Sequence, residues 1–213
     1  LVNSPLNSLI VLKNSGINKI EDLKGKKVGY SVSGFETVLL DAMLKSANLS
    51  EKDVELVNVN FSLSPSLMSK QVDAVIGAFR NFELNQLKLE KEEGKVFLPE
   101  DYGVPKYDEL IVVANKDTIS QAKYKNFVKS LQEATNYLKE NPEKSWEAFI
   151  SYKPKELDNE LNRLAWADTL PYLAANPAVF DKEVYNQMAN FMKQNKLIKA
   201  LPNLDEYAQE LLK

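Results

Sequence analysis

The sequence predicts an α/β fold whose first half alternates strands with helices and whose second half is mostly helical. Up to residue 114, short apolar runs rich in branched residues alternate with helix-like periodicity, which is typical of βαβ units and a mainly parallel sheet. From Thr118 onward strand signals disappear, and helical segments are joined at prolines and asparagines. The 213 residues are enough for one large domain or two small ones.

The individual elements follow from local patterns. Strands are expected at Ser8–Leu12, Lys26–Ser31, Val54–Val59, Asp73–Ala78, Lys95–Leu98 and Glu109–Ala114. A helical turn is expected at Ile20–Leu23, and helices at Ser64–Gln71, at Phe82–Leu89 and directly after Ser33. Ser33 and Glu36 have the spacing of a capping box, in which each side chain accepts a hydrogen bond from a free N–H at the helix start.

Composition excludes several classes of function. The net charge is −3 and the basic residues are mixed with acidic ones, so we expect no nucleic-acid partner. The longest apolar runs are about five residues, far short of the ~20 that cross a bilayer, so no membrane insertion is expected. The chain has no cysteine and no histidine, which removes the commonest metal ligand and proton-transfer group. We therefore expect no metal site and no cofactor, and catalysis, which Asp, Glu, Lys or Tyr could still perform, is less expected.

The chain opens with "LVNSPLNSLIVLK", which has neither an initiator methionine nor the charged start of a signal peptide. We expect this stretch to come from the interior of a larger chain.

Two segments leave expected strands where an open parallel sheet binds its ligands, beyond the carboxyl ends. The first is "GYSVSGFE", Gly29 to Glu36, whose small residues and helix start suit an anion or an electron-rich oxygen. The alternative is that Ser33 and Glu36 only cap the helix. The segment is neither a GxGxxG motif nor a P-loop, so it gives little support for dinucleotide binding.

The second segment is "GAFRNFE", Gly77 to Glu83. Phe79 and Phe82 offer flat faces on which a heterocycle could stack, and Glu83 offers a carboxylate that accepts from an amine. The alternative is that both phenylalanines belong to the core and that Glu83 is an exposed charge in the first turn of a helix. Trp146 and Trp166 lie on helices at apolar spacing, which favours a core role.

Three stretches carry a family resemblance: "INKIEDLKGKKVGYSVSGFE", "ELVNVNFSLSPSLMSKQVDAVIGAFRNFE" and "YGVPKYDELIVVANKD". Together they resemble the thiamine-pyrimidine group of periplasmic binding proteins, which are solute-binding subunits of ABC importers. This group is related to the sulfonate- and taurine-binding proteins, and hydroxymethylpyrimidine phosphate synthases share its fold. The resemblance runs from about Ser8 to Asp117, and the helical tail fits it more loosely.

The resemblance implies a type II periplasmic-binding-protein-like fold with two lobes that close about a hinge. Residues 1–16 would be a first-lobe segment and hinge, residues 17–114 the α/β second lobe that binds ligand, and residues 115–213 a helical return to the first lobe. The resemblance also implies that the usual first third, with the core strands of the first lobe, lies outside this sequence.

The resemblance also implies a site for a substituted aminopyrimidine. Glu83 would accept from the amine of the ring, Phe79 and Phe82 would form a wall or platform, and Asn81 would make a polar contact. Ser33, Gly34 and Phe35 would meet the substituent arm or its anionic group, and Tyr107 would lie near the hinge.

The function implied is a non-catalytic periplasmic or otherwise extracytoplasmic protein, free or lipid-anchored. It would deliver a pyrimidine thiamine precursor to an ABC transporter permease. One alternative is a hydroxymethylpyrimidine phosphate synthase, whose chemistry in the resembling enzymes depends on a histidine and on lysine-held pyridoxal phosphate. Others are the effector-sensing domain of a transcription regulator and a binding protein for a sulfonate, flavin or nitrate-like ligand.

Overall fold

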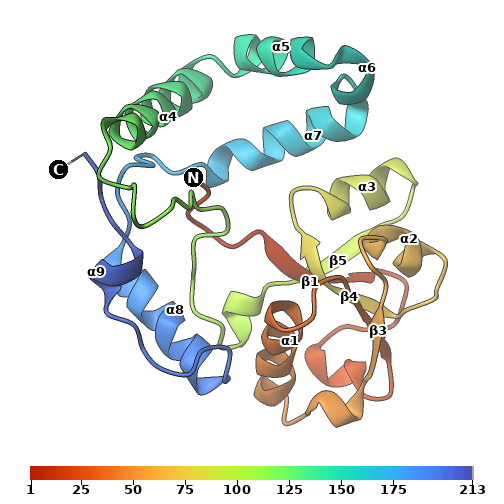
Figure 1. Ribbon diagram of the computed structural model, residues 1–213. Helices are drawn as coiled ribbons and strands as arrows, with labels where there is room; N and C mark the ends of the chain where they lie inside the picture. Colours follow the sequence, from red (N-terminus) through yellow and green to blue (C-terminus); the bar gives the residue numbers. More distant parts are fainter. Residues whose placement is uncertain (213) are drawn as a thin grey trace. The chain divides into compact units, whose positions relative to one another are not determined.

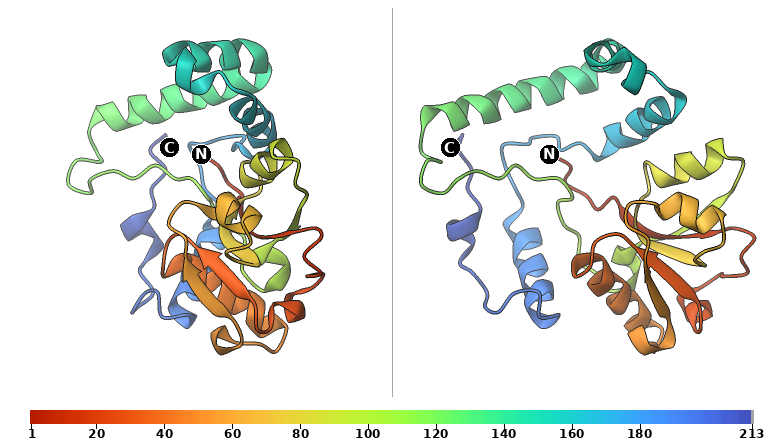
Figure 2. Two further views of the ribbon diagram at one scale, coloured as in Figure 1. Left: turned by 90° about the vertical axis from the view of Figure 1, so that its right-hand side faces the viewer. Right: turned by 45° about the vertical axis from the view of Figure 1, so that its right-hand side comes forward.

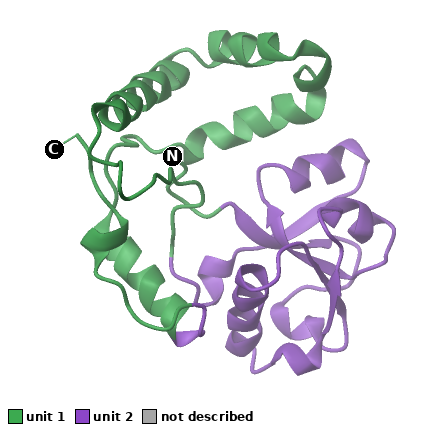
Figure 3. Ribbon diagram, viewed as in Figure 1, with its two compact units in different colours: residues 1–5, 106–193, 198–213 green, residues 6–105, 194–197 purple. Residues whose placement is uncertain are grey.

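The computed structural model describes residues 1–212, and the chain divides into two compact units (Figure 3). Unit 2 comprises residues 6–105 and 194–197. Unit 1 comprises residues 1–5 and 106–193 and the stretch from Ile198 onward. The chain therefore passes between the units several times, which is typical of domains joined by more than one connection.

Unit 2 is built on a five-stranded sheet with the order β3-β2-β4-β1-β5 (Figure 1). The strands are β1 (Asn7–Leu12), β2 (Lys27–Tyr30), β3 (Glu55–Asn58), β4 (Ala74–Phe79) and β5 (Gly94–Phe97). β2 runs parallel to β3 and β4, whereas β1 is antiparallel to both β4 and β5. The expected mainly parallel sheet is therefore confirmed, with β1 as the exception.

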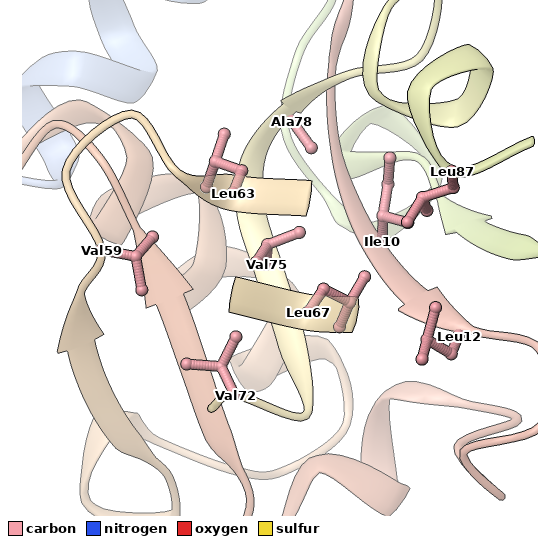
Figure 4. Close-up of a cluster of buried hydrophobic side chains, with 9 residues drawn as sticks. All are labelled: Ile10, Leu12, Val59, Leu63, Leu67, Val72, Val75, Ala78 and Leu87. Atoms are coloured by element: carbon pink, nitrogen blue, oxygen red, sulfur yellow. The ribbon is translucent and has the colours of Figure 1, made fainter. Parts of the chain in front are cut away.

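Helices cover both faces of this sheet (Figures 1 and 2). They are α1 (Phe35–Ser46), α2 (Leu63–Met68) and α3 (Glu83–Leu89), with 3-10 helices η1 (Ile20–Leu23), η2 (Glu51–Asp53) and η3 (Pro99–Tyr102). Side chains of α2 and α3 pack with one face of the strands (Figure 4). This cluster is Ile10, Leu12, Val59, Leu63, Leu67, Val72, Val75, Ala78 and Leu87. Full burial of one such aliphatic side chain contributes about 1.5–3 kcal/mol to stability.

β1 is buried on both faces of the sheet. All six of its residues are buried, because alternate side chains point to opposite faces of a strand and both faces are covered. The sequence assigned this stretch to the first lobe, but the structure places it between β4 and β5 in unit 2. An apolar strand that is buried on both faces belongs inside a sheet rather than in a connection.

Unit 1 is helical, as the second half of the sequence predicts. Its elements are α4 (Ala122–Glu140), α5 (Pro142–Tyr152), α6 (Pro154–Leu157), α7 (Glu160–Thr169), η4 (Leu170–Tyr172), α8 (Lys182–Gln194) and α9 (Leu204–Tyr207). Pro142 and Pro154 are the first residues of α5 and α6. Proline is tolerated there because the N–H that it lacks would have no hydrogen-bond partner within the helix. Trp146 packs against Phe149 and Trp166, with ring centroids 5.8 and 5.7 Å away.

The strand expected at Glu109–Ala114 is wrong. Within the described residues this stretch forms only an isolated antiparallel bridge between Leu110 and Val2, with N···O distances of 3.2 and 3.3 Å. A sequence with strong strand propensity becomes a strand only where a second strand pairs with it.

Candidate functional site

Three loops of unit 2 leave the sheet at the same edge. Because β2 is parallel to both β3 and β4, the carboxyl ends of these three strands lie together. The loops that follow start at Ser31, Val59 and Arg80. Both segments singled out in the sequence therefore emerge at the edge where sheets of this kind bind ligands.

Glu36, in the first turn of α1, turns its buried carboxylate back towards the end of β2. One oxygen, Oε2, accepts hydrogen bonds from the backbone N–H groups of Ser31, at 2.8 Å, and Val32, at 3.0 Å. The capping box expected between Ser33 and Glu36 is wrong, because no side chain caps α1. Gly34 is the N-cap, with a φ of 95°, and this turn directs the carboxylate to the two earlier amides.

Gly77 provides the space that Glu36 needs. The register between β4 and β1 shifts between Ser8 and Leu9, which leaves Gly77 as the extra residue of a β-bulge with a φ of 94°. A Cβ placed on Gly77 would lie 2.3 Å from Cδ of Glu36. A bulge bends its strand and can re-aim the residues near it, and the segment leading to Glu83 follows Gly77 directly.

Glu83 begins α3, and its Oε2 accepts a hydrogen bond from the backbone N–H of Phe79 at 2.6 Å. Burial raises the pKa of Glu83, and the nearby carboxylate of Glu36 raises it further, against the lowering effect of its backbone hydrogen bonds. No lysine or arginine forms an ion pair with Glu83 among residues 1–212. A half-buried carboxylate of this kind is suited to accept hydrogen bonds from an amine.

The aromatic residues predicted for the site flank this carboxylate along the chain. Phe79 ends β4 and Phe82 is the N-cap of α3, and both are partly buried. Asn81, which lies between them in sequence, is buried, and its backbone carbonyl oxygen accepts from Nδ2 of Asn85 at 3.1 Å. This hydrogen bond ties the first turn of α3, in which Glu83 lies, to the loop after β4.

Arg80 lies in the same loop but has a structural role. Its Nη1 and Nη2 contact the two carboxylate oxygens of Glu100 at 2.7 and 3.0 Å, and Nη2 also donates to the carbonyl of Asn7 at 2.8 Å. Only 10% of its side chain is exposed. This bidentate pair joins the end of β4 to η3 and leaves Arg80 engaged away from Glu83.

The remaining predicted residues fall in two places. Ser33 is exposed, Gly34 and Phe35 are partly buried, and all three lie between β2 and the first turn of α1. Tyr107 is buried, but it belongs to unit 1, two residues after the chain leaves unit 2 at Pro105. The structure therefore brings the other seven predicted residues to one edge of unit 2, whereas Tyr107 lies outside this unit.

Phe61 is a candidate that the sequence reasoning missed. It follows β3 at the same edge, and 85% of its surface is exposed. Asn60, with a φ of 51°, donates its N–H to Oδ1 of Asn58 at 2.8 Å, and this turn precedes the exposed ring. The signal was present in "NVNFSLS", an aromatic residue among polar ones directly after a strand.

The described residues contain no group of three or more acidic side chains that could hold a metal ion. None of their helices is both long and apolar enough to cross a bilayer.

Comparison with known proteins identifies the family. The model of the family described as NMT1/THI5 like matches residues 1–145. The chain belongs to the NMT1/THI5-like family. A Haemophilus influenzae protein named for thiamine biosynthesis is 61% identical over 211 residues, which make up 99% of this chain and 67% of that protein.

Other relatives of this NMT1/THI5-like chain differ in their named roles. The formylaminopyrimidine-binding protein of Halalkalibacterium halodurans is 35% identical over 122 residues, covering 57% of this chain and 37% of that protein. A 4-amino-5-hydroxymethyl-2-methylpyrimidine phosphate synthase of Schizosaccharomyces pombe is 24% identical over 208 residues, covering 91% and 58%.

The fold matches that of solved solute-binding proteins. The periplasmic aliphatic sulphonate binding protein SsuA from Escherichia coli superposes with a TM-score of 0.71 at 16% identity, over 97% of this chain and 68% of SsuA. The expected α/β fold of the periplasmic-binding-protein type is confirmed. At this identity the match establishes the fold and leaves the ligand open.

Proposed function

We propose that this chain is the ligand-recognising part of an extracytoplasmic solute-binding subunit of an ABC importer, and that it binds an aminopyrimidine precursor of thiamine. The observation that carries the proposal is the carboxylate of Glu83, which is half-buried and close to Glu36 and has no lysine or arginine paired with it among residues 1–212. Family membership and the formylaminopyrimidine-binding relative favour this ligand class over others on the same fold.

In the proposed complex Glu83 recognises the amine edge of the ring. Its Oε2 is held by the N–H of Phe79, so Oε1 accepts from the exocyclic amine of the pyrimidine. A hydrogen bond to a charged group contributes about 1.5–3 kcal/mol net. The neighbouring carboxylate of Glu36 adds negative potential, which disfavours an anionic group at this position.

Aromatic side chains supply the flat surface that a heterocycle needs. Phe61 is exposed and free to stack on a ring, and Phe79 and Phe82 form the wall beside Glu83. One aromatic stack adds about 0.5–1.5 kcal/mol beyond area burial. Asn81, together with Ser33, Gly34 and Phe35, would contact the substituents of the pyrimidine.

Delivery to a permease would depend on closure. The chain crosses between its units next to Pro105, and Tyr107 lies just beyond this crossing. A ligand that contacts both lobes stabilises the closed form by its difference in affinity for the two states. In this scheme unit 2 supplies the second-lobe half of the site.

The rival function is that of the hydroxymethylpyrimidine phosphate synthases, which are also among the relatives. The resemblance assigns a histidine to their chemistry, and the 213 residues of this chain contain none. A binding role needs no such residue, which favours it. Absorbance of lysine-bound pyridoxal phosphate, measured on the whole protein, would support the enzyme instead.

Calorimetric titration with formylaminopyrimidine, hydroxymethylpyrimidine and taurine tests the proposal. We expect the pyrimidines to bind, taurine not to bind, and Glu83→Gln to weaken pyrimidine binding roughly tenfold or more. Glu90→Gln is the matched control, because Glu90 is exposed at the opposite end of α3. Equal affinity of the wild-type and Glu83→Gln proteins for the pyrimidines would show that Glu83 is not part of the site. Binding of taurine without binding of either pyrimidine would show that the ligand is a sulfonate.

A further inference from the structure

The connections of the unit 2 sheet diverge between β2 and β4. The chain that leaves β2 leads to β3 on one side of this pair, and the chain that leaves β4 leads to β5 on the other side. In open sheets of this kind, ligands bind beyond the carboxyl ends of the strands at such a point. A side chain that occupies this position therefore takes a place that part of a ligand would otherwise use.

The carboxylate of Glu36 occupies this position. Its Oε2 accepts from the N–H groups of Ser31 and Val32, the first two residues after β2. On the side of β4, its Cδ and both oxygens lie 2.3–2.6 Å from the position of a Cβ on Gly77. One buried carboxylate thus extends from the end of β2 to the bulge in β4.

The two amides held by Glu36 have the arrangement of an anion site. Successive backbone N–H groups that point at one acceptor form a concave surface that binds anions. Here the acceptor is an oxygen of the protein itself, so both N–H groups are already engaged. The segment from Gly29 to Glu36 suits an anion, as its sequence indicates, but the anion that it holds is the side chain of Glu36.

The charges nearby also oppose a ligand anion at this position. Glu36 is close enough to Glu83 to raise the pKa of the Glu83 carboxyl. Arg80, in the loop before Glu83, is engaged with Glu100 and with the carbonyl of Asn7. Like charges that face each other across an interface strongly weaken binding. A phosphate or sulfonate group would meet two carboxylates beside amides that are already engaged.

We propose that Glu36 is a specificity-determining residue, which fills the anion position of the site and restricts the site to ligands without a phosphate or sulfonate group. The inference rests on the proposed function for the identity of the ligand. It selects one form of that ligand, the unphosphorylated aminopyrimidine rather than its phosphate ester. Specificity of this kind comes from an unfavourable contact with the wrong ligand.

Calorimetric titration with hydroxymethylpyrimidine and with its phosphate ester tests the exclusion. We expect the wild-type protein to bind the unphosphorylated compound roughly a hundredfold more tightly. Glu36→Ala should narrow this ratio about tenfold by improving the affinity for the phosphate ester. Asp41→Ala should keep the wild-type ratio. It is the matched control, because Asp41 is the next acidic residue of α1 and pairs with Lys45. Equal wild-type affinities for the two compounds, or an unchanged ratio in folded Glu36→Ala, would overturn the proposal.

A titration with inorganic phosphate tests the same position without any pyrimidine. In the ¹⁵N-labelled wild-type chain, the amide signals of Ser31 and Val32 should not respond to phosphate. In Glu36→Ala these amides lose their acceptor, so phosphate should shift both signals. Wild-type signals that shift as far as those of the variant, or variant signals that do not move, would overturn the proposal. If the proposed function fails, neither pyrimidine binds in calorimetry, yet this titration still decides the role of Glu36.

Glu36→Gln covers the case in which the alanine variant does not fold. Its Oε1 can still accept from Ser31 and Val32, but the side chain carries no charge. We expect this variant to narrow the ratio of the two affinities about fivefold, since only the repulsion between charges is lost. A ratio as large as that of the wild-type protein would overturn the proposal, as would a response of the wild-type amides to phosphate.

Discussion

The carboxylate of Glu36 occupies the space where a side chain on Gly77 would have to lie. Cδ and both oxygens of Glu36 are 2.3–2.6 Å from the position of a Cβ on Gly77. The bulge in β4 and the loop after β2 are therefore coupled, because Glu36 contacts the first at Gly77 and holds the second through Ser31 and Val32. Glu83 follows β4 at this same edge of the sheet.

Gly77→Ala should be more destabilising than replacement of a glycine of unit 2 whose Cβ position is open. Gly16→Ala is the matched control, since Gly16 has a φ of 81° and nothing within 4 Å of its Cβ position. Left-handed backbone alone costs about 1–2 kcal/mol for alanine. Overpacking against Glu36 should add about 1–3 kcal/mol for Gly77→Ala. Equal free energies of unfolding in urea for the two variants would show that Glu36 moves away without cost.

Replacement of Arg80 by methionine should lower the free energy of unfolding by about 3 kcal/mol or more, because Glu100 would keep a largely buried charge without its partner. Adding Glu100→Gln removes that charge, so the double variant should recover part of the loss. If the double variant is no more stable than Arg80→Met, the bond from Arg80 to Asn7 is the main contribution.

Glu83 should make stability depend on pH in a defined direction. Its pKa in the folded protein is raised above 4.5, mainly by burial, so the folded state binds the proton more tightly than the unfolded state. The free energy of unfolding should therefore fall as pH rises from about 4.5 through the folded pKa of Glu83. Glu83→Gln should remove this part of the slope. Urea unfolding at several pH values compares the two proteins, and parallel curves would contradict burial of the carboxylate.

Phe61→Ala should weaken ligand binding with almost no change in the free energy of unfolding. Because the ring is 85% exposed, its loss should change the free energy of unfolding by less than about 0.5 kcal/mol. Loss of a stacking surface should nevertheless weaken pyrimidine binding about fivefold. Unchanged affinity in calorimetry would mean that Phe61 is not a platform.

Much of unit 2 was predictable because its signals are local. Alternating strand and helix patterns located all five strands, and Ser33, Gly34 and Phe35 lie at the same edge as Glu83, as parallel topology requires. The resemblance pointed to the same segments. The capping role expected for Ser33 was wrong, because a capping box and a carboxylate that accepts from earlier amides have the same spacing in sequence.

Other features depend on neighbours that no local pattern contains. The position of β1 in unit 2 depends on pairing with β4 and β5, which are distant in sequence. Glu109–Ala114 has the composition of a strand but only Leu110 finds a partner, at Val2. The bulge at Gly77 could not be foreseen, because it is a shift in the register of β4 against β1, a strand that is distant in sequence.

The most direct test of the proposed site is an NMR titration of the ¹⁵N-labelled chain with formylaminopyrimidine. Because the N–H of Phe79 donates to Glu83, a ligand at this carboxylate should shift the Phe79 amide signal, together with those of Ser31 and Val32, which donate to Glu36. The account predicts that the largest shifts cluster at these amides and at Phe61, and that Glu83→Gln suppresses them. Shifts that leave this edge unchanged and gather elsewhere in the chain would contradict it.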